Sequence, residues 1–240
     1  GSEMCIRDRS FTTPEAAMVF SCEGLGHMSR QFHRAIRLNL CRGPWKDQRR
    51  PILINNWEAT YFDFNTEKIV KIAEKAASLG VEMMVLDDGW FKGRNDTSSS
   101  LGDWAADTRK LPQGLPGLCK KINLLELDMG LWVEPEAISP DSDLYRAHPD
   151  WAFGIPGREP LEIRQQYTLD FSRPEVVAGI WQQLDAVLQS CPLKYLKWDM
   201  NRSLAQVYSA VLPAKRQGEV YHRYLSLIHI SEPTRRTPIS

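Results

Sequence analysis

The sequence predicts an α/β fold, specifically a (β/α)8 TIM barrel that is truncated after about five βα units and follows the end of an earlier β domain. Short strand-forming runs alternate with amphipathic helical segments, at spacings that suit βαβ units and a parallel sheet. Polar residues follow every predicted strand, as they do around a barrel, whereas a doubly wound sheet gathers its ligands at one switch point. No glycine-rich phosphate-binding motif follows a predicted strand, so the sequence disfavours a nucleotide-binding function.

Both ends of the chain are predicted to be foreign to this fold. Residues 1–9 and 226–240 resemble translated sequencing-adapter read-through. A helical pattern through Tyr221, Tyr224 and Leu225 stops without a capping residue and runs into two prolines. The expected organisation is therefore a foreign segment at 1–9, a domain end with linker at 10–50, a partial barrel at 51–225, and a foreign segment at 226–240.

The part before the barrel is predicted to be the remainder of a β domain. Residues 11–20 are expected to form one strand of that domain. Apolar residues at helical spacing predict a helix over 27–40. A connector rich in proline and charge, at 43–51, then leads into the barrel.

Five strands and three helices are predicted in the barrel. Gly80 closes the first helix, and Pro174 lies in the first turn of the third. The predicted strands are 52–54, 83–86, 130–133, 167–169 and 195–198, and the predicted helices are 66–79, 115–127 and 174–188. The polar or aromatic residues that follow these strands include Asn55, Asn56, Trp57, Asp87, Asp88, Glu134, Glu136, Asp170, Asp199 and Asn201.

Composition narrows the class of ligand. Thirty Lys and Arg balance thirty Asp and Glu, so no net field would attract nucleic acid or an anionic membrane surface. The five cysteines occur singly, without metal-type spacing to the five histidines, which predicts free thiols in a reducing compartment and no bound metal. The N-terminus has no basic-then-apolar signal pattern, so a cytoplasmic protein is expected, and no cofactor is expected. No apolar run approaches the roughly 20 residues that span a bilayer. The expected ligand is small or neutral, and eight tryptophans suit the apolar faces of sugars.

The last predicted strand carries the densest group of functional side chains. Alternation along Y-L-K-W-D-M-N-R places Lys197, Asp199 and Asn201 on one side of the backbone. A cation, a carboxylate and an amide on one face at a strand end indicate a polar site. The stretch alone leaves a second interpretation open, in which Asp199 caps a following helix and Lys197 only pairs with it.

Five motifs occur in order within roughly 11–225: N-N-W-E-A-T-Y-F-D-F, L-D-D-G-W-F, G-L-W-V-E-P-E, L-D-F-S-R-P-E-V and K-W-D-M-N-R. Together they resemble the α-galactosidases of glycoside hydrolase family 36. The resemblance implies a retaining exo-glycosidase with a (β/α)8 catalytic barrel after a β-sandwich domain. It also implies hydrolysis of terminal α-linked galactose from sugars such as raffinose or melibiose, and leaves open a homo-oligomer for the full-length protein.

The resemblance assigns roles to individual residues. Asp199 matches the nucleophile, and nearby Lys197 would favour its ionised form. Asp87 and Asp88 match the pair that accepts hydrogen bonds from galactose hydroxyls, with a helix-capping D-D-G turn as the alternative. The other matches are Trp57 and Trp132 as walls against the sugar, Arg164 as a sugar-contacting arginine, and Lys197 and Asn201 around the 2-hydroxyl and ring substituents.

Two acidic residues and one missing group complete the interpretation. Glu134 and Glu136 are interpreted as structural groups at the barrel top, with a place in the sugar site as the alternative. A retaining mechanism needs a second carboxyl roughly 5 to 5.5 Å from the nucleophile. In the family this acid/base is an Asp in a glycine-rich motif after the sixth strand, and this sequence has no such motif. The chain is therefore expected to be the product of a partial gene and to be inactive by itself.

The residues also allow two competing functions. An α-glucosidase-type retaining barrel also has a W-x-D-M-N-like strand end, but it would carry an acidic residue where Arg202 stands and no D-D-G-W pair. A non-catalytic carbohydrate-binding protein would not require Lys197 and Asp199 on one strand face. Both alternatives fit the sequence less well than a retaining α-galactosidase.

Overall fold

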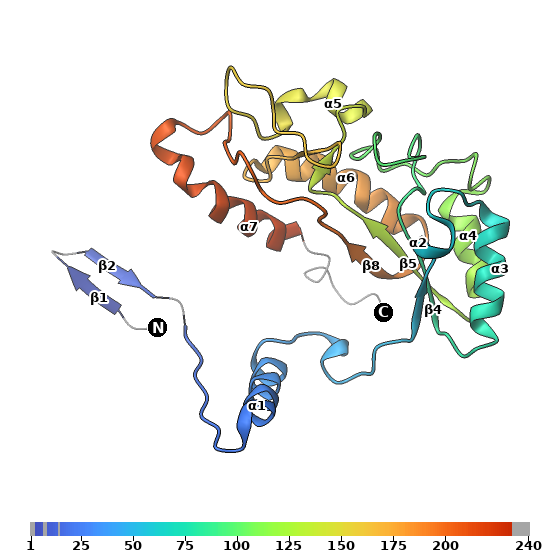
Figure 1. Cartoon of the computed structure of the whole chain (residues 1–240), viewed down its shortest axis with the longest axis horizontal. Helices are drawn as coiled ribbons and strands as arrows, with labels where there is room; N and C mark the ends of the chain where they lie inside the picture. The colour runs from blue at the N-terminus through green and yellow to red at the C-terminus, as the bar shows by residue number, and fades with distance from the viewer. Residues whose placement is uncertain (1–2, 7–8, 14, 232–240) are drawn as a thin grey trace. The chain divides into compact units, whose positions relative to one another are not determined.

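The computed structural model describes residues 3–6, 9–13 and 15–231 (Figure 1). It divides into two compact units, Gly1–Arg50 and Pro51–Ser240. Most of the predicted foreign segment at 226–240 lies outside the described residues, including both of its prolines. The assignment of 1–9 and 226–240 as foreign, and of 10–50 to a sandwich domain, stays a prediction.

The first unit contains a hairpin and a helix. Strands β1 (Glu3–Ile6) and β2 (Arg9–Thr12) pair antiparallel. Helix α1 (Gly24–Asn39) agrees with the predicted helix to within a few residues, and the 3-10 helix η1 (Pro44–Lys46) lies in the predicted connector.

The strand predicted over 11–20 is wrong beyond Thr12. Residues 13 and 15–20 have no regular structure, and the side chains of Met18 and Phe20 are 94% and 83% exposed. An extended segment becomes a stable strand only where another strand satisfies its N–H and C=O groups. Among the described residues, no strand pairs with residues 15–20.

The second unit is built on a four-stranded parallel sheet, in the order β3 (Leu53–Asn55), β4 (Met83–Leu86), β5 (Asp128–Val133) and β8 (Leu193–Trp198). Each strand pairs with the next parallel strand along the chain, as in a barrel wall, whereas a doubly wound sheet reverses its order at a switch point. The predicted α/β architecture, a partial barrel, is confirmed.

One predicted strand does not belong to this sheet. Tyr167–Thr168 forms β7, which pairs antiparallel with β6 (Ala137–Ile138). As a result β8 lies directly beside β5, with Trp132 opposite Lys197. The strand predicted at 195–198 is therefore the fourth strand of the parallel sheet and not the fifth. The reason is that the short segment at 167–168 forms its strand hydrogen bonds with β6, in the loop after β5.

The three predicted barrel helices form between these strands. They are α3 (Thr66–Ala77), α4 (Gly114–Asn123) and α6 (Pro174–Ser190), and α4 contacts both of the others. The side chain of Asn65 caps α3 by accepting from the Lys68 N–H, and Gly80 follows it with a positive φ of 81°. Helix α4 ends at Asn123, although the predicted helix extends to residue 127. It cannot continue to 127 because Glu126 adopts a positive φ of 60°.

The core lies between the sheet and these helices. All four residues of β4 are buried, as are Ile69 of α3 and Ile180 of α6. Four large aromatic side chains of this core pack on one another: Trp90, Phe91, Trp104 and Trp132.

The remaining helices are α2 (Trp57–Thr60), α5 (Asp143–Ala147), η2 (Pro149–Trp151), η3 (Ala214–Glu219) and α7 (Val220–Ser231). No helix in the described part of the chain could cross a membrane.

Candidate active site

The carboxyl ends of the four parallel strands surround a cavity of about 240 Å³. The structure places every site residue predicted from the sequence at its wall, and it adds Arg94, Thr97, Glu134 and Gln166. The full lining is Trp57, Asp87, Asp88, Arg94, Thr97, Trp132, Glu134, Arg164, Gln166, Lys197, Asp199 and Asn201. These side chains come from segments up to 144 residues apart in sequence numbers, from Trp57 to Asn201, which only the folded sheet brings together.

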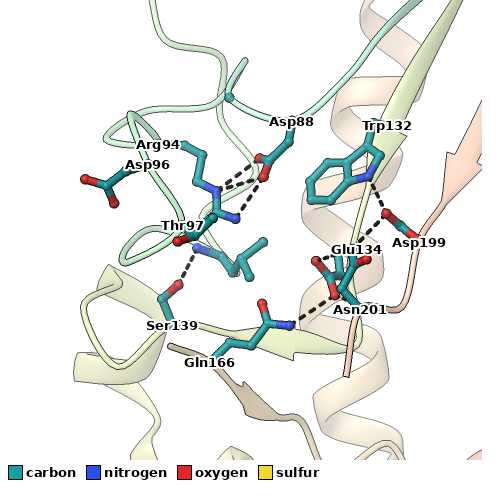
Figure 2. A network of polar contacts seen from close by, with 12 residues as sticks. Asp88, Arg94, Asp96, Thr97, Trp132, Glu134, Ser139, Gln166, Asp199 and Asn201 are labelled. Carbon is teal, nitrogen blue, oxygen red and sulfur yellow. Dashed lines mark hydrogen bonds and ion pairs between the residues drawn. The ribbon is translucent and has the colours of Figure 1, made fainter. Parts of the chain in front are cut away.

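Asp199 lies just after β8 and accepts hydrogen bonds from three donors. Its Oδ2 accepts from the Trp132 Nε1–H at 2.9 Å and from the Asn201 Nδ2–H at 2.8 Å (Figure 2). Its Oδ1 accepts from the Met200 backbone N–H at 3.1 Å. Burial acts to raise the pKa of Asp199, but these hydrogen bonds and the charge of Lys197 outweigh it and hold the pKa below its usual range. The carboxyl is therefore ionised at neutral pH.

Lys197 forms its ion pair with Asp87 and not with Asp199. The Nζ of Lys197 lies 2.8 Å from Asp87 Oδ2, across the intervening strand β5. The same oxygen accepts from Asn55 Nδ2 at 2.5 Å, and the Asp87 N–H donates to Asn56 Oδ1 at 2.8 Å. The interpretation in which Lys197 merely pairs with Asp199 is wrong, because the side chain reaches over β5 to the end of β4.

Asp88 is paired with an arginine that the sequence analysis missed. Arg94 Nη2 lies 2.8 Å from Asp88 Oδ2, and Arg94 Nε lies 3.0 Å from Oδ1 (Figure 2), and the two side chains are 3% and 8% exposed. Burial raises the pKa of Asp88, although Arg94 opposes the shift. Arg94 Nη1 also donates to the Ser99 carbonyl at 2.8 Å. Arg94 lies in an irregular polar loop, where no sequence periodicity distinguishes one charged residue from another. Its role becomes visible only in the structure, where it is the cation beside the buried Asp88.

Glu134 lines the cavity, which corrects its interpretation as a structural group only. Its Oε1 accepts from the Asn201 backbone N–H at 2.6 Å and its Oε2 from Asn201 Nδ2 at 3.1 Å, so it orients the amide that also bonds Asp199. Gln166 Nε2 donates to Oε1 at 3.2 Å (Figure 2). Burial raises the pKa of Glu134, and the charge of Asp199 adds to the shift.

Glu136, two residues further along, has the structural role predicted for both glutamates. It is buried away from the cavity lining and accepts from Trp198 Nε1 at 2.9 Å. The Tyr224 hydroxyl donates to its other oxygen. Glu136 thus connects β8 to α7, while Glu134 serves the cavity.

The rim of the cavity is formed by two loops that contact each other. Arg164 is exposed and has φ 56°, in the left-handed region that non-glycine residues rarely adopt, and Gln165 follows with φ 60°. Arg202 holds this loop by donating from Nη1 to the Gln166 carbonyl at 2.5 Å. Thr97 from the loop after β4 donates to Gln165 Oε1 at 2.8 Å. These contacts place Arg164 at the mouth of the cavity.

The described residues contain no group of three or more His, Cys, Asp and Glu side chains arranged to hold a metal ion. The four carboxyl groups of the cavity, those of Asp87, Asp88, Glu134 and Asp199, each bond to another side chain of the lining. What the arrangement offers chemically is a carboxylate without an ion-pair partner among the described residues, Asp199, beside two carboxylates in ion pairs, an ammonium group and two indole rings.

Known proteins resemble this chain over most of its length. The family model described as Melibiase matches residues 10–235. The α-galactosidase AgaA of Geobacillus stearothermophilus is 53% identical over 231 residues, which are 95% of this chain and 32% of that protein. Alpha-galactosidase 1 of Pediococcus pentosaceus is 52% identical over 216 residues, which are 90% of this chain and 30% of that protein.

Solved structures agree with these sequence relatives. The crystal structure of the glycoside hydrolase family 36 α-galactosidase AgaA from Geobacillus stearothermophilus has a TM-score of 0.89 at 53% identity, covering 93% of this chain and 31% of that one. The galactosidase domain of the α-galactosidase-sucrose kinase AgaSK has a TM-score of 0.82 at 46% identity, covering 88% of this chain and 28% of that one. This chain spans about a third of the length of the curated relatives it matches. It belongs to the Melibiase family, within glycoside hydrolase family 36 as its motifs predict.

Proposed function

We propose that this chain is part of a retaining α-galactosidase that removes terminal α-linked galactose, with Asp199 as the nucleophile. The observation that carries the proposal is the setting of Asp199, an ionised carboxylate fixed by Trp132 and Asn201 in a cavity of about 240 Å³ at the strand ends. Two solved structures of the Geobacillus relative are complexes with raffinose and with stachyose. They support α-galactoside oligosaccharides such as raffinose as the substrate class, and we include melibiose in this class.

In this proposal Asp199 attacks the anomeric carbon and forms a covalent glycosyl-enzyme intermediate that water then hydrolyses. Oδ2 already accepts two hydrogen bonds, whereas Oδ1 accepts one among the described residues. Oδ1 is therefore the oxygen more available for the bond to carbon. The lowered pKa keeps it unprotonated before the attack.

Sugar recognition is assigned to the polar wall opposite. Asp87 and Asp88 would accept hydrogen bonds from O4 and O6, because each is a buried carboxylate whose position is set by a cation, Lys197 or Arg94. An axial O4 distinguishes galactose from glucose, so two acceptors fixed in this way favour galactose. Trp57 and Trp132 would pack against the apolar face of the ring, and Arg164 would contact the sugar at the cavity mouth.

We assign the general acid/base to a part of the complete protein outside this chain. The other carboxyls of the cavity already have partners: Asp87 and Asp88 bind cations, and Glu134 holds Asn201 and Gln166. General acid catalysis typically contributes about 10² to 10⁴-fold to the rate. We therefore expect the 240-residue chain by itself to show no measurable galactosidase activity.

The test uses a hybrid protein, in which this chain replaces the segment of the Geobacillus α-galactosidase that it matches. We expect the hybrid to hydrolyse an aryl α-galactoside and to release α-galactose first, as NMR of the fresh product would record. The isolated chain serves as the comparison and should not turn over. Faster cleavage of an aryl α-glucoside would assign a glucosidase instead, and sugar binding without turnover would assign a binding protein.

A prediction for Glu134 follows from its two bonds to Asn201. Glu134→Gln leaves one acceptor oxygen, so either the backbone or the side-chain N–H of Asn201 loses its partner and the amide no longer orients Asp199. Because misplacement of a reacting group by about 1 Å can cost about 10²-fold in rate, we expect kcat of the hybrid to fall by about 10- to 10²-fold with KM little changed.

Glu136→Gln is the matched control for this prediction. Glu136 is a buried glutamate on the same loop, but its partners Trp198 and Tyr224 lie outside the cavity lining. We expect this variant to lower the melting temperature while kcat stays close to that of the parent. Equal kcat values for the two variants would remove Glu134 from the positioning of Asp199.

A further inference from the structure

Two cysteines meet on the side of the sheet covered by helices, away from the active-site cavity. Cys119 belongs to α4 and is fully buried. Cys191 ends α6 and immediately precedes Pro192 and β8, and its side chain is half-buried. Both are free thiols. Neither has a role in the proposed hydrolysis.

The contacts around the two thiols show that they face the same junction. Cys119 Sγ lies 4.0 Å from the Pro192 carbonyl oxygen, the residue after Cys191, and 3.4 Å from Asn123 Oδ1 on its own helix. The Ser190 hydroxyl lies 3.7 Å from Cys191 Sγ. Helices α4 and α6 contact each other as well. Backbone and side-chain atoms on both sides therefore bring the α4 thiol to the end of α6.

The thiols also influence one another electrostatically. Burial, and then the interaction with the Cys191 thiol, raise the pKa of Cys119 to about 12. A buried thiol with so high a pKa is a poor nucleophile towards outside reagents. Cys191 differs because its side chain is only half-buried, whereas that of Cys119 is fully buried. The pair thus combines an accessible thiol with a sheltered one.

A surface hollow gives access to this pair. It has a volume of about 400 Å³ and shares no lining residue with the active-site cavity. Ser190, Cys191 and Pro192 form one of its walls, and Lys120 and Asn123 of α4 form the other. A small reagent can therefore reach Cys191 from solvent without entering the active site.

We propose that Cys119 and Cys191 form a modification site, a dithiol that a small disulfide such as glutathione disulfide oxidises to an intramolecular disulfide between α4 and the end of α6. In the first step the Cys191 thiolate attacks one sulfur of glutathione disulfide. The disulfide bond of the reagent breaks, and the departing glutathione thiolate takes up the proton that Cys191 lost.

In the second step Cys119 resolves the mixed disulfide. Its sulfur loses a proton and attacks the Cys191 sulfur, and the second glutathione departs as a thiolate that is then protonated. Once Cys191 is bonded to glutathione it carries no negative charge, so the repulsion that helps to raise the pKa of Cys119 is removed. Overall the two cysteines lose two electrons and two protons, and one glutathione disulfide becomes two glutathione molecules.

The disulfide should also stabilise the fold. It would close a long loop between α4 and α6, and cross-links of long loops restrict the unfolded chain most. We expect the oxidised chain to melt at a higher temperature than the reduced chain and to return to the lower value after treatment with dithiothreitol.

The experiment incubates the full chain with glutathione disulfide under native conditions, blocks free thiols, and maps peptides by mass spectrometry. A peptide pair linked through Cys119 and Cys191, with two hydrogen atoms lost, is the expected result. The matched control is the variant with Cys5, Cys22 and Cys41 all replaced by Ser, which should form the same link. The map uses the unaltered chain, so its outcome does not depend on how a variant folds.

Single variants test the order of the steps. Cys119→Ser should stop at a glutathione adduct on Cys191 that persists, and Cys191→Ser should leave Cys119 unmodified. The proposal is overturned if the native chain yields links to Cys22 or Cys41 instead, if glutathione adducts on Cys191 persist in the presence of Cys119, or if both thiols remain free.

Discussion

Replacement of Asp199 by Ala in the hybrid protein should abolish hydrolysis of α-galactosides. Removal of a catalytic nucleophile costs about 10⁶-fold in turnover in a well-studied protease, and we expect a loss on the order of 10⁴ to 10⁶-fold here. The reason is that no other described carboxylate in the cavity is free to attack: Asp87, Asp88 and Glu134 are each engaged by fixed donors. The measurement is kcat on an aryl α-galactoside.

Azide distinguishes loss of the nucleophile from loss of the fold. In the alanine variant, azide can enter the vacated space and attack the anomeric carbon from the face that Asp199 occupied. Some release of the aryl group should return, with β-galactosyl azide as the product. Asp128→Ala, at the opposite end of neighbouring β5 and exposed, is the control and should stay fully active. Near-parental activity of Asp199→Ala would remove Asp199 from the mechanism.

Replacement of Arg94 by Met should produce the largest loss of stability. The variant leaves the Asp88 carboxylate buried without its cation, and breaking one side of a buried ion pair typically costs about 3 to 5 kcal/mol. Loss of the bond to the Ser99 carbonyl also releases the loop that carries Thr97. The free energy of unfolding of the hybrid, followed in urea by tryptophan fluorescence, measures the effect.

The pH dependence of this loss has a definite sign. Burial already raises the pKa of Asp88, and removal of Arg94 raises it further because Arg94 opposes the shift. A carboxyl with a raised pKa in the folded state holds a proton that the unfolded state has released, so stability falls as pH rises between the two values. The deficit of Arg94→Met should therefore shrink as the pH is lowered from 7 towards the ordinary aspartate pKa of about 3.9.

Two further variants separate charge from packing. Asp88→Asn combined with Arg94→Met removes the unpaired charge and should recover part of the stability. Arg146→Met is the surface control, since that ion pair is more than half exposed and such pairs contribute about 0 to 1 kcal/mol. A loss for Arg94→Met no greater than for Arg146→Met would contradict the buried pair.

Much of the barrel wall could be predicted because local pattern determines it. The fully apolar run at 83–86 forms a strand with both faces buried, and the predicted helices at 66–79 and 174–188 form with their caps at or near the expected residues. Asp87, Asp88, Glu134 and Asp199 lie at one cavity because the carboxyl ends of neighbouring parallel strands share one edge of the sheet. The catalytic and binding roles of these residues stay predictions until the variants are measured.

The errors concern segments whose structure depends on distant partners. Residues 15–20 have a strand-like pattern, yet no described segment pairs with them. Residues 167–168 do form a strand, but their hydrogen bonds go to Ala137–Ile138 and not to the parallel sheet. A short apolar run specifies an extended backbone, and only the available partner decides which sheet it joins.

The sequence by itself therefore determined the fold class, the positions of the parallel strands and the set of polar residues at their ends, since these follow from periodicity and from neighbouring residues. Only the tertiary structure decided how those residues are paired. Lys197 binds Asp87 across β5, Arg94 from an irregular loop neutralises Asp88, and Glu134 orients Asn201 beside Asp199. The physical reason is that a buried charge or amide must find a partner in three dimensions, and that partner can lie 110 residues away, as for Lys197 and Asp87.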